Sequence, residues 1–194
     1  MSTDHAIETE VKIPVPAWTQ TDAPRNLAAL GLTVSSPRVF EANFVYDTPD
    51  QALRGTQMLL RLRRVGDRNL LTWKGPPIAG PHKSRPELEI TFSSFDTMHQ
   101  ILQHLGYRTS FRYEKYRTEF SGADAGTVTY DETPIGNFLE LEGHGPWIDQ
   151  TARQLGFSPH DYVLDSYGRL YLAHCEKVGM QPLNMLFPST LRNG

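Results

Sequence analysis

The chain has 194 residues, which is enough to bury a hydrophobic core without disulfides or a structural metal. Hydrophobic residues make up 39% and charged residues 21%, too apolar a composition for a disordered protein, and no apolar run is long enough to cross a bilayer. The formal net charge of −3 argues against a general affinity for nucleic acid or for an anionic membrane. We therefore expect a soluble globular protein in which any anion-binding site is local.

The compartment and the domain organisation are predicted from two simple features. The single cysteine, Cys175, excludes an internal disulfide, and residues 1–5 have neither the basic nor the apolar segment of a signal peptide. Both features predict a cytoplasmic protein. We expect one domain over residues 1–180 and a C-terminal tail at 181–194, and the sequence leaves the oligomeric state open, a homodimer included.

Short runs of alternating apolar and polar residues cover most of the chain and predict an α+β protein rich in antiparallel sheet. In chain order, we predict strands at residues 5–13, 38–47, 57–65, 69–74, 85–92, 111–121, 126–131 and 137–143. Helical periods predict helices at residues 23–30, 95–105, 148–155 and 167–177, each ending near a glycine. Residues 75–84 contain three prolines and two glycines, which predicts a loop and excludes a strand there.

The predicted strands carry charged side chains at every second position, so that the charges share one face of the sheet. On the first strand, Glu8 and Glu10 lie on the opposite face from Ile7 and Val11. The same charged face continues along the chain at Lys12, Arg61, Arg63, Lys74, Arg85, Glu87, Glu89, Lys115, Arg117, Asp131, Glu140 and Glu142.

Two interpretations fit this charged face. An open sheet with a solvated face would explain any one strand. Over so many strands, however, the opposite apolar face needs cover, and four amphipathic helices are available to supply it. We therefore predict a closed eight-stranded antiparallel β-barrel with charges inside and helices packed outside. Desolvated acids and bases need partners, and a polyphosphate bound with Mg²⁺ or Mn²⁺ supplies both.

The run Glu8-Thr9-Glu10-Val11-Lys12 resembles the ExExK signature of the CYTH superfamily, also called triphosphate tunnel metalloenzymes. This superfamily includes class IV adenylate cyclases, thiamine triphosphatases and inorganic triphosphatases. The similarity continues at Tyr46-Asp47-Thr48-Pro49, Arg61-Leu62-Arg63, Leu71-Thr72-Trp73-Lys74-Gly75-Pro76, residues 85–89, Glu114-Lys115-Tyr116-Arg117 and residues 130–142. The resemblance implies a tunnel-like barrel, a divalent metal held by oxygen ligands and a small-molecule substrate that carries a triphosphate.

The resemblance also implies a role for each charged residue. It assigns metal binding to five acidic residues, Glu8, Glu10, Asp131, Glu140 and Glu142. It assigns triphosphate binding to seven basic residues, Lys12, Arg61, Arg63, Lys74, Arg85, Lys115 and Arg117, and it implies direct catalytic roles for Lys12 and Asp131. Glu87 and Glu89 are left open between supporting the metal and orienting Lys74 or Arg85 through ion pairs.

The resemblance favours class IV adenylate cyclase chemistry, in which ATP becomes cyclic AMP and pyrophosphate. Residues 73–76 and 136–142, with the helix after Ser166, look closer to those cyclases than to inorganic triphosphatases. The alternative is hydrolysis of inorganic tripolyphosphate, thiamine triphosphate or a nucleoside triphosphate, and a third interpretation is a non-catalytic polyphosphate or nucleotide sensor. The two acidic pairs argue against the sensor, because an anion binder needs only the bases. Neither nucleic acid nor a membrane is an expected partner.

Overall fold

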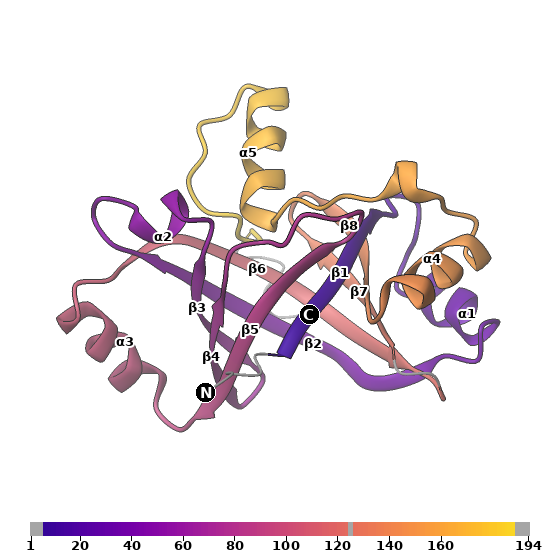
Figure 1. Cartoon of the computed structure of the whole chain (residues 1–194), viewed down its shortest axis with the longest axis horizontal. Helices are drawn as coiled ribbons and strands as arrows, with labels where there is room; N and C mark the ends of the chain where they lie inside the picture. The colour runs from indigo at the N-terminus through magenta and orange to yellow at the C-terminus, as the bar shows by residue number, and fades with distance from the viewer. Residues whose placement is uncertain (1–5, 124–125, 189–194) are drawn as a thin grey trace.

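Eight antiparallel strands close into a barrel in the order β1-β5-β4-β3-β2-β6-β7-β8 (Figure 1). The computed structural model describes residues 6–123 and 126–188. The strands are β1 (Ala6–Pro14), β2 (Thr33–Asp47), β3 (Leu59–Val65), β4 (Arg68–Lys74), β5 (Lys83–Phe92), β6 (Arg108–Ser121), β7 (Thr127–Thr133) and β8 (Gly136–Glu142). Closure comes from β1, which pairs with β5 on one side and with β8 on the other. The predicted closed eight-stranded barrel is confirmed.

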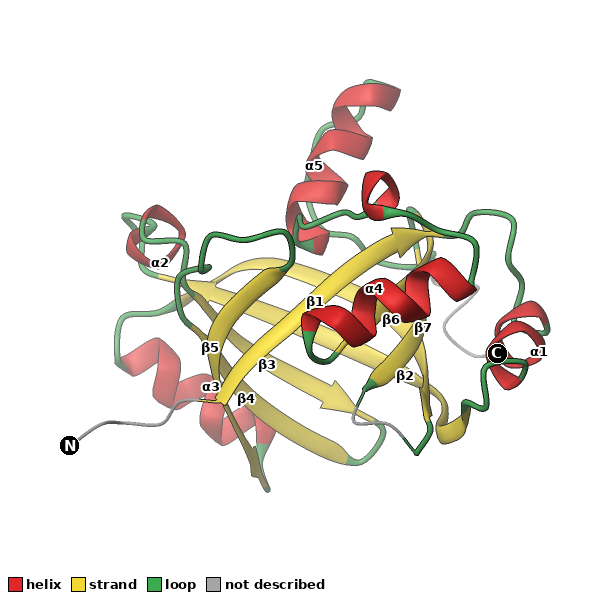
Figure 2. Cartoon of the chain, turned by 45° about the vertical axis from the view of Figure 1, so that its right-hand side comes forward, coloured by secondary structure: helices red, strands yellow, loops and turns green. Residues whose placement is uncertain are grey.

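The helices lie outside this barrel (Figure 2). They are α1 (Asp22–Ala28), α2 (Ala52–Gly55), α3 (Phe95–His104), α4 (Gly145–Gln154), the 3₁₀ helix η1 (Pro159–Asp161) and α5 (Tyr167–Val178). All four predicted helices are present, whereas α2 and η1 are too short to produce a periodic pattern. Along the described residues, no helix has both the length and the apolar character needed to span a membrane.

Most outward apolar side chains of the strands form the hydrophobic core beneath the helices, whereas Ile7, Leu88 and Ile90 are exposed. Val11 and Ile13 of β1 are fully buried in one cluster with Ile148 of α4. Leu62 of β3 is buried in a second cluster, with Phe95 of α3. Because neighbouring side chains in a strand point to opposite faces, burying these residues outside turns the charged positions between them into the barrel.

The predicted boundaries differ from the observed ones by up to five residues, and the difference at the start of β5 matters for the site. β2 begins earlier than predicted, and its first part pairs with β6 through register shifts near Ser36 and Val39 that disrupt the alternation. The predicted loop ends too late, because Lys83 belongs to β5 and pairs with Glu10 of β1. The first predicted strand begins at His5, which lies outside the described residues, and β1 begins at Ala6.

Part of the predicted C-terminal tail packs against β6 within the described residues 181–188. The Met185 amide donates to the carbonyl of Arg112 at 3.0 Å, and the Met185 carbonyl accepts from the Glu114 amide at 2.9 Å. The Met185 side chain is 1% exposed and lies in a cluster with the buried Cys175 of α5. The part of the tail around Met185 therefore packs on β6, whereas residues 181–184 are exposed.

Candidate active site

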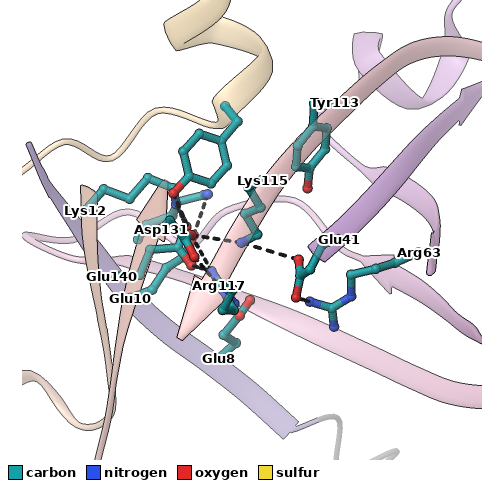
Figure 3. Close-up of polar contacts among 12 residues, drawn as sticks. Glu8, Glu10, Lys12, Glu41, Arg63, Tyr113, Lys115, Arg117, Asp131 and Glu140 are labelled. Atoms are coloured by element: carbon teal, nitrogen blue, oxygen red, sulfur yellow. Dashed lines mark hydrogen bonds and ion pairs between the residues drawn. The ribbon is translucent and has the colours of Figure 1, made fainter. Parts of the chain in front are cut away.

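The inside of the barrel brings the predicted acidic and basic side chains together (Figure 3). The most deeply buried are Asp131, Lys115 and Lys12, which are 0%, 2% and 3% exposed. Glu89 and Glu142 are the exposed members of the set. Charges at this depth are stable only when each has a partner, so their contacts define how the site is organised.

Asp131 of β7 is the centre of the most completely hydrogen-bonded cluster. Its carboxylate accepts from Lys115 Nζ at 2.8 Å and, in a bidentate arrangement, from Nε and Nη2 of Arg117, both at 2.7 Å. The hydroxyl of Tyr167, the first residue of α5, donates to Asp131 Oδ2 at 2.7 Å. Arg117 also contacts Glu140 of β8. Asp131 thus fixes two bases and the start of α5, and its predicted roles in metal binding and catalysis stay predictions.

A second cluster lies where β1 meets β8. Lys12 Nζ is 3.1 Å from Glu10 Oε1 and 3.1 Å from Glu140 Oε1, so it bridges the two strands. Lys83 Nζ, from β5, is 2.6 Å from the same Glu10 oxygen. Although burial opposes it, Lys12 and Lys83 hold the pKa of Glu10 well below its ordinary value. The two lysines therefore favour the ionised form of Glu10.

The third cluster connects β1, β4 and β5. Lys74 contacts Glu8 and lies 2.8 Å from Glu87 Oε2. Burial raises the pKa of Glu8 to about 7, and the nearby carboxylates of Glu87 and Glu10 add to the effect. At Glu8, burial and the neighbouring carboxylates thus outweigh the ion pair with Lys74, and Glu87 is a second ion-pair partner of Lys74.

The fourth cluster joins side chains of β2, β3, β4, β5 and β6. Arg63 Nη2 is 2.9 Å from Glu89 Oε2, and Arg63 Nη1 is 3.5 Å from Glu41 Oε1. Arg61 donates to the hydroxyl of Tyr113 at 3.1 Å and to Thr72 Oγ1 at 3.2 Å. Arg61 Nη2 is also 3.9 Å from Glu89 Oε2, so both predicted arginines lie inside the barrel beside this carboxylate.

Arg85 differs from the other predicted phosphate-binding residues in what it contacts. Its guanidinium donates to the carbonyl oxygen of Gly75 from Nε at 2.9 Å and from Nη2 at 2.6 Å, and to that of Gln57 at 2.8 Å. These bonds link β5 to the segments before β3 and after β4. In the structure, Arg85 holds two connections at one end of the barrel, and phosphate binding by it remains a prediction.

Sequence analysis missed several inward residues: Glu41, Asn43, Lys83, Tyr113 and Tyr167. Glu41 and Asn43 lie on the opposite face of β2 from the outward Phe44, so their inward direction follows from the period of two. Sequence analysis applied this period only to residues that match the family pattern. Lys83 was assigned to the loop. The contact of Tyr167 with Asp131 joins residues from a helix and a distant strand, which no local pattern predicts.

The acidic residues offer a donor set that suits a hard divalent cation. Glu10 and Glu142 are directly opposite each other on β1 and β8, an arrangement that is repulsive unless a cation lies nearby. Carboxylate oxygens without histidine or cysteine are the ligands that Mg²⁺ and Mn²⁺ prefer. Within the described residues, no three His, Cys, Asp or Glu side chains already converge as a metal-binding group, since Lys12, Lys74 and Lys83 lie among the carboxylates. The residues fit a metal if these lysines turn toward an anion.

A cavity of about 980 Å³ lies at one end of the barrel, where the tunnel meets α5. Its walls come from the β2–β3 connection, the β4–β5 loop, the start of β6, α5 and the C-terminal segment. Several lining side chains are apolar: Met58, Ile78, Phe111, Tyr171, Leu172 and Leu183. Lys83, Tyr113 and Tyr167 line it as well and also contact residues of the charged interior, so these three side chains separate the cavity from the buried charges by a single layer of contacts.

The fold and the site therefore define a closed barrel with an interior of paired acids and bases. The family model described as "CYTH domain" matches residues 6–167 of the chain, and the chain belongs to this family. Among curated proteins, a Methanocaldococcus jannaschii protein provisionally named adenylate cyclase is 28% identical over 136 residues, covering 70% of this chain and 76% of that protein.

Solved structures share the fold at low sequence identity. A protein from Vibrio parahaemolyticus, also provisionally named adenylate cyclase, superimposes with a TM-score of 0.75 at 20% identity, covering 86% of this chain and 98% of the other. The PH1819 protein of Pyrococcus horikoshii superimposes with a TM-score of 0.71 at 23% identity, covering 86% of this chain and 99% of the other. A Hippeastrum protein superimposes with a TM-score of 0.58 at 14% identity, covering 91% of this chain and 97% of the other. These similarities establish the barrel architecture.

Proposed function

We propose that this protein is a divalent-metal-dependent enzyme that acts on a triphosphate inside the barrel, with class IV adenylate cyclase-like chemistry on ATP. The observation that carries the proposal is the buried set of bases in the tunnel of a CYTH protein. Lys12, Lys115 and Arg117 are at most 9% exposed, and all three point into the barrel. A multiply charged anion is the ligand that such a set of cations stabilises best.

The basic residues would hold the phosphate chain. Lys12 bridges Glu10 and Glu140, and Lys115 and Arg117 are fixed on Asp131, so the three cations are already oriented. Preorganised cations stabilise the charge that develops on a departing phosphate without the cost of reorganising solvent. Lys12 is central among these groups, in keeping with a direct role in catalysis.

The acidic residues would hold the metal, with Glu8, Glu10, Glu140 and Glu142 as its ligands and Asp131 nearby. When bound, Mg²⁺ or Mn²⁺ supplies charge neutralisation and lowers the pKa of the attacking group. The lysines that now pair with these carboxylates would turn to the phosphate oxygens. This exchange of partners keeps every buried charge compensated.

The cavity at the end of the barrel supports a substrate with an organic group. Tripolyphosphate alone would leave its apolar walls uncovered, whereas a nucleoside would contact side chains such as Phe111 and Tyr171. In the cyclase reaction, the ribose 3′ oxygen forms a bond to the α-phosphorus as the bond from that phosphorus to the β-phosphate oxygen breaks. The hydroxyl proton is released, and pyrophosphate leaves with the basic residues around it.

Hydrolysis of the terminal phosphate is the second candidate. The Hippeastrum protein, which shares the fold and is provisionally named an adenylyl cyclase, is described as having a dominant triphosphatase activity. The same residues serve this reaction, because water replaces the ribose hydroxyl as the nucleophile and the terminal phosphorus replaces the α-phosphorus. The two reactions differ in which phosphorus faces the nucleophile.

The test is incubation with ATP, and separately with inorganic tripolyphosphate, each with Mg²⁺ or Mn²⁺, followed by separation of cyclic AMP, ADP, pyrophosphate and phosphate. Cyclic AMP with an equal amount of pyrophosphate supports the cyclase. ADP or phosphate without cyclic AMP supports the triphosphatase. If neither substrate gives a product with either metal, the proposal is contradicted for both the cyclase and the triphosphatase.

Substitution of one predicted metal ligand tests the site itself. Glu10→Gln should abolish metal-dependent turnover, because it removes a carboxylate charge from the proposed ligand set. Glu132→Gln is the matched control, since Glu132 is the neighbour of Asp131 on β7 and pairs with Arg38 at 2.8 Å on the outside of the barrel. Equal activity of the two variants would contradict the metal role of Glu10.

A further inference from the structure

The amide of Asn43 is buried inside the barrel without a hydrogen-bond partner. Asn43 lies on β2, is 1% exposed, and shares its face with Glu41. Its direct neighbours across the sheet are Arg63 on β3 and Tyr113 on β6, both with side chains inside the barrel. Within the described residues, neither Nδ2 nor Oδ1 of Asn43 has a hydrogen-bond partner.

The unpartnered polar atoms are concentrated on this one part of the wall. Among the described residues, six buried side-chain nitrogen or oxygen atoms have no hydrogen-bond partner. Five of the six belong to β2 and β3, and only Thr129 Oγ1 lies elsewhere. The five are Asn43 Nδ2, Asn43 Oδ1, Arg61 Nε, Arg63 Nε and Glu41 Oε2, of which Glu41 Oε2 is still 3.6 Å from Lys115 Nζ in an ion pair. The cluster around Asp131, by contrast, contributes none of them.

A buried amide that lacks partners is destabilising, so native proteins supply a partner from protein, water or ligand. The available atoms here are mainly donors: the Asn43 amide nitrogen and the Nε–H groups of two arginines. A phosphoryl group carries several acceptor oxygens and negative charge, and so can accept from an amide and two guanidinium groups together. This combination favours an anion over a single neutral water.

The position of this wall relates it to the cavity. Tyr113 lines the cavity, lies next to Asn43 across the sheet, and accepts a hydrogen bond from Arg61 at 3.1 Å. The Asn43 patch therefore lies at the inner end of the cavity, where the organic group of a substrate would give way to its phosphates.

We propose that Asn43 is a substrate-binding residue whose amide, together with Nε of Arg61 and Nε of Arg63, binds a phosphoryl group at the inner end of the cavity. This inference rests on the proposed function, because it takes a triphosphate as the ligand of the tunnel. It adds a neutral donor to a set otherwise made of charged groups, and this donor fixes the position of the phosphoryl oxygens through its directional hydrogen bond.

The experiment compares two asparagines with opposite hydrogen-bonding states. Asn43→Leu keeps the approximate shape and removes an unpartnered amide. Asn137→Leu is the matched control, because the Asn137 amide already donates to the carbonyl of Trp18 at 2.9 Å. Binding of inorganic tripolyphosphate is measured by calorimetry in metal-free buffer, and thermal unfolding is followed without the anion.

Asn43→Leu should weaken tripolyphosphate binding about 10-fold or more, with an unfolding temperature equal to or above that of the unsubstituted protein. Asn137→Leu should lower the unfolding temperature and leave the affinity unchanged. If Asn43→Leu does not fold, Asn43→Asp serves instead, since its carboxylate pairs with the arginines and should weaken anion binding further.

The outcomes separate this inference from the proposed function. Unchanged affinity in a folded Asn43 variant, while the unsubstituted protein binds tripolyphosphate, overturns the role of Asn43 alone. Destabilisation of Asn43→Leu with unchanged affinity also overturns it, because the amide would then be structural. If the unsubstituted protein binds tripolyphosphate only after Mg²⁺ is added, the variants are compared in that buffer. Absence of binding both without metal and with Mg²⁺ overturns both the inference and the proposed function.

Discussion

The hydrogen bond from Tyr167 to Asp131 connects α5 to the charged interior, and its removal is a direct test of the buried network. Tyr167→Phe deletes only the hydroxyl that donates to Asp131 Oδ2 at 2.7 Å. The ring remains to pack against Tyr113 and Phe138, whose centroids are 5.9 and 5.6 Å away. Burial, with the negative charge of Asp131, raises the pKa of Tyr167 well above its ordinary value, so the hydroxyl stays protonated and can donate.

The expected loss follows from the charge of the acceptor. A hydrogen bond to an ionised group contributes about 1.5–3 kcal/mol, and one between neutral groups about 0.5–1.5 kcal/mol. For a protein of this size, Tyr167→Phe should therefore lower the unfolding temperature by about 3–12 °C. Tyr130→Phe is the matched control, because the Tyr130 hydroxyl donates to the neutral carbonyl of Trp18 at 2.9 Å.

The assay is equilibrium unfolding of both variants in urea, checked by thermal unfolding. The free energy of unfolding should fall more for Tyr167→Phe than for Tyr130→Phe. Equal losses, or a smaller loss for Tyr167→Phe, would refute the reasoning that a charged and fully buried acceptor makes the Tyr167 bond the stronger one.

Two further predictions concern stability. Although burial opposes it, Lys115, Arg117 and Arg63 lower the pKa of Glu41 to about 2, which corresponds to about 3 kcal/mol of stability. That contribution is complete above pH 4.5 and is lost as the pH falls toward 2. The difference in free energy of unfolding between the unsubstituted protein and Glu41→Gln, measured in urea, should therefore narrow from pH 7 to pH 2.5. A constant difference would contradict the lowered pKa of Glu41. Gly126→Ala would place a methyl group 2.4 Å from the Trp147 ring and should lower the free energy of unfolding in urea by about 1–3 kcal/mol. In the control Gly55→Ala, the added methyl group meets nothing within 4 Å, so this substitution should be neutral or stabilising. Equal effects of the two substitutions would contradict the prediction.

The direction in which each strand side chain points was predictable because it depends on local geometry. Glu10 and Lys12 had to share a face with each other and not with Val11, whatever the strand pairs with. Repetition of this pattern along the chain was enough to predict a charged interior. Where the local pattern was irregular, as at the start of β2, the prediction of the boundary failed.

Only the tertiary structure decided which side chains lie opposite each other inside the barrel. The register between β1 and β8 places Glu10 opposite Glu142, and the register between β1 and β5 brings Lys83 to Glu10. Registers and closure depend on the pairing of strands far apart in the sequence, which is selected by the packing of the whole barrel and not by any one strand.

The sequence by itself determined the strands, the inward charges and the likeness to CYTH proteins, because these follow from residue order and a period of two. The tertiary structure alone decided that Tyr167 reaches Asp131, that the segment after α5 packs on β6, and that Asn43 is buried without a partner. Each of these depends on contacts between distant segments. Such contacts form only when the chain has closed, since their geometry is fixed by burial of the outer apolar faces against the helices.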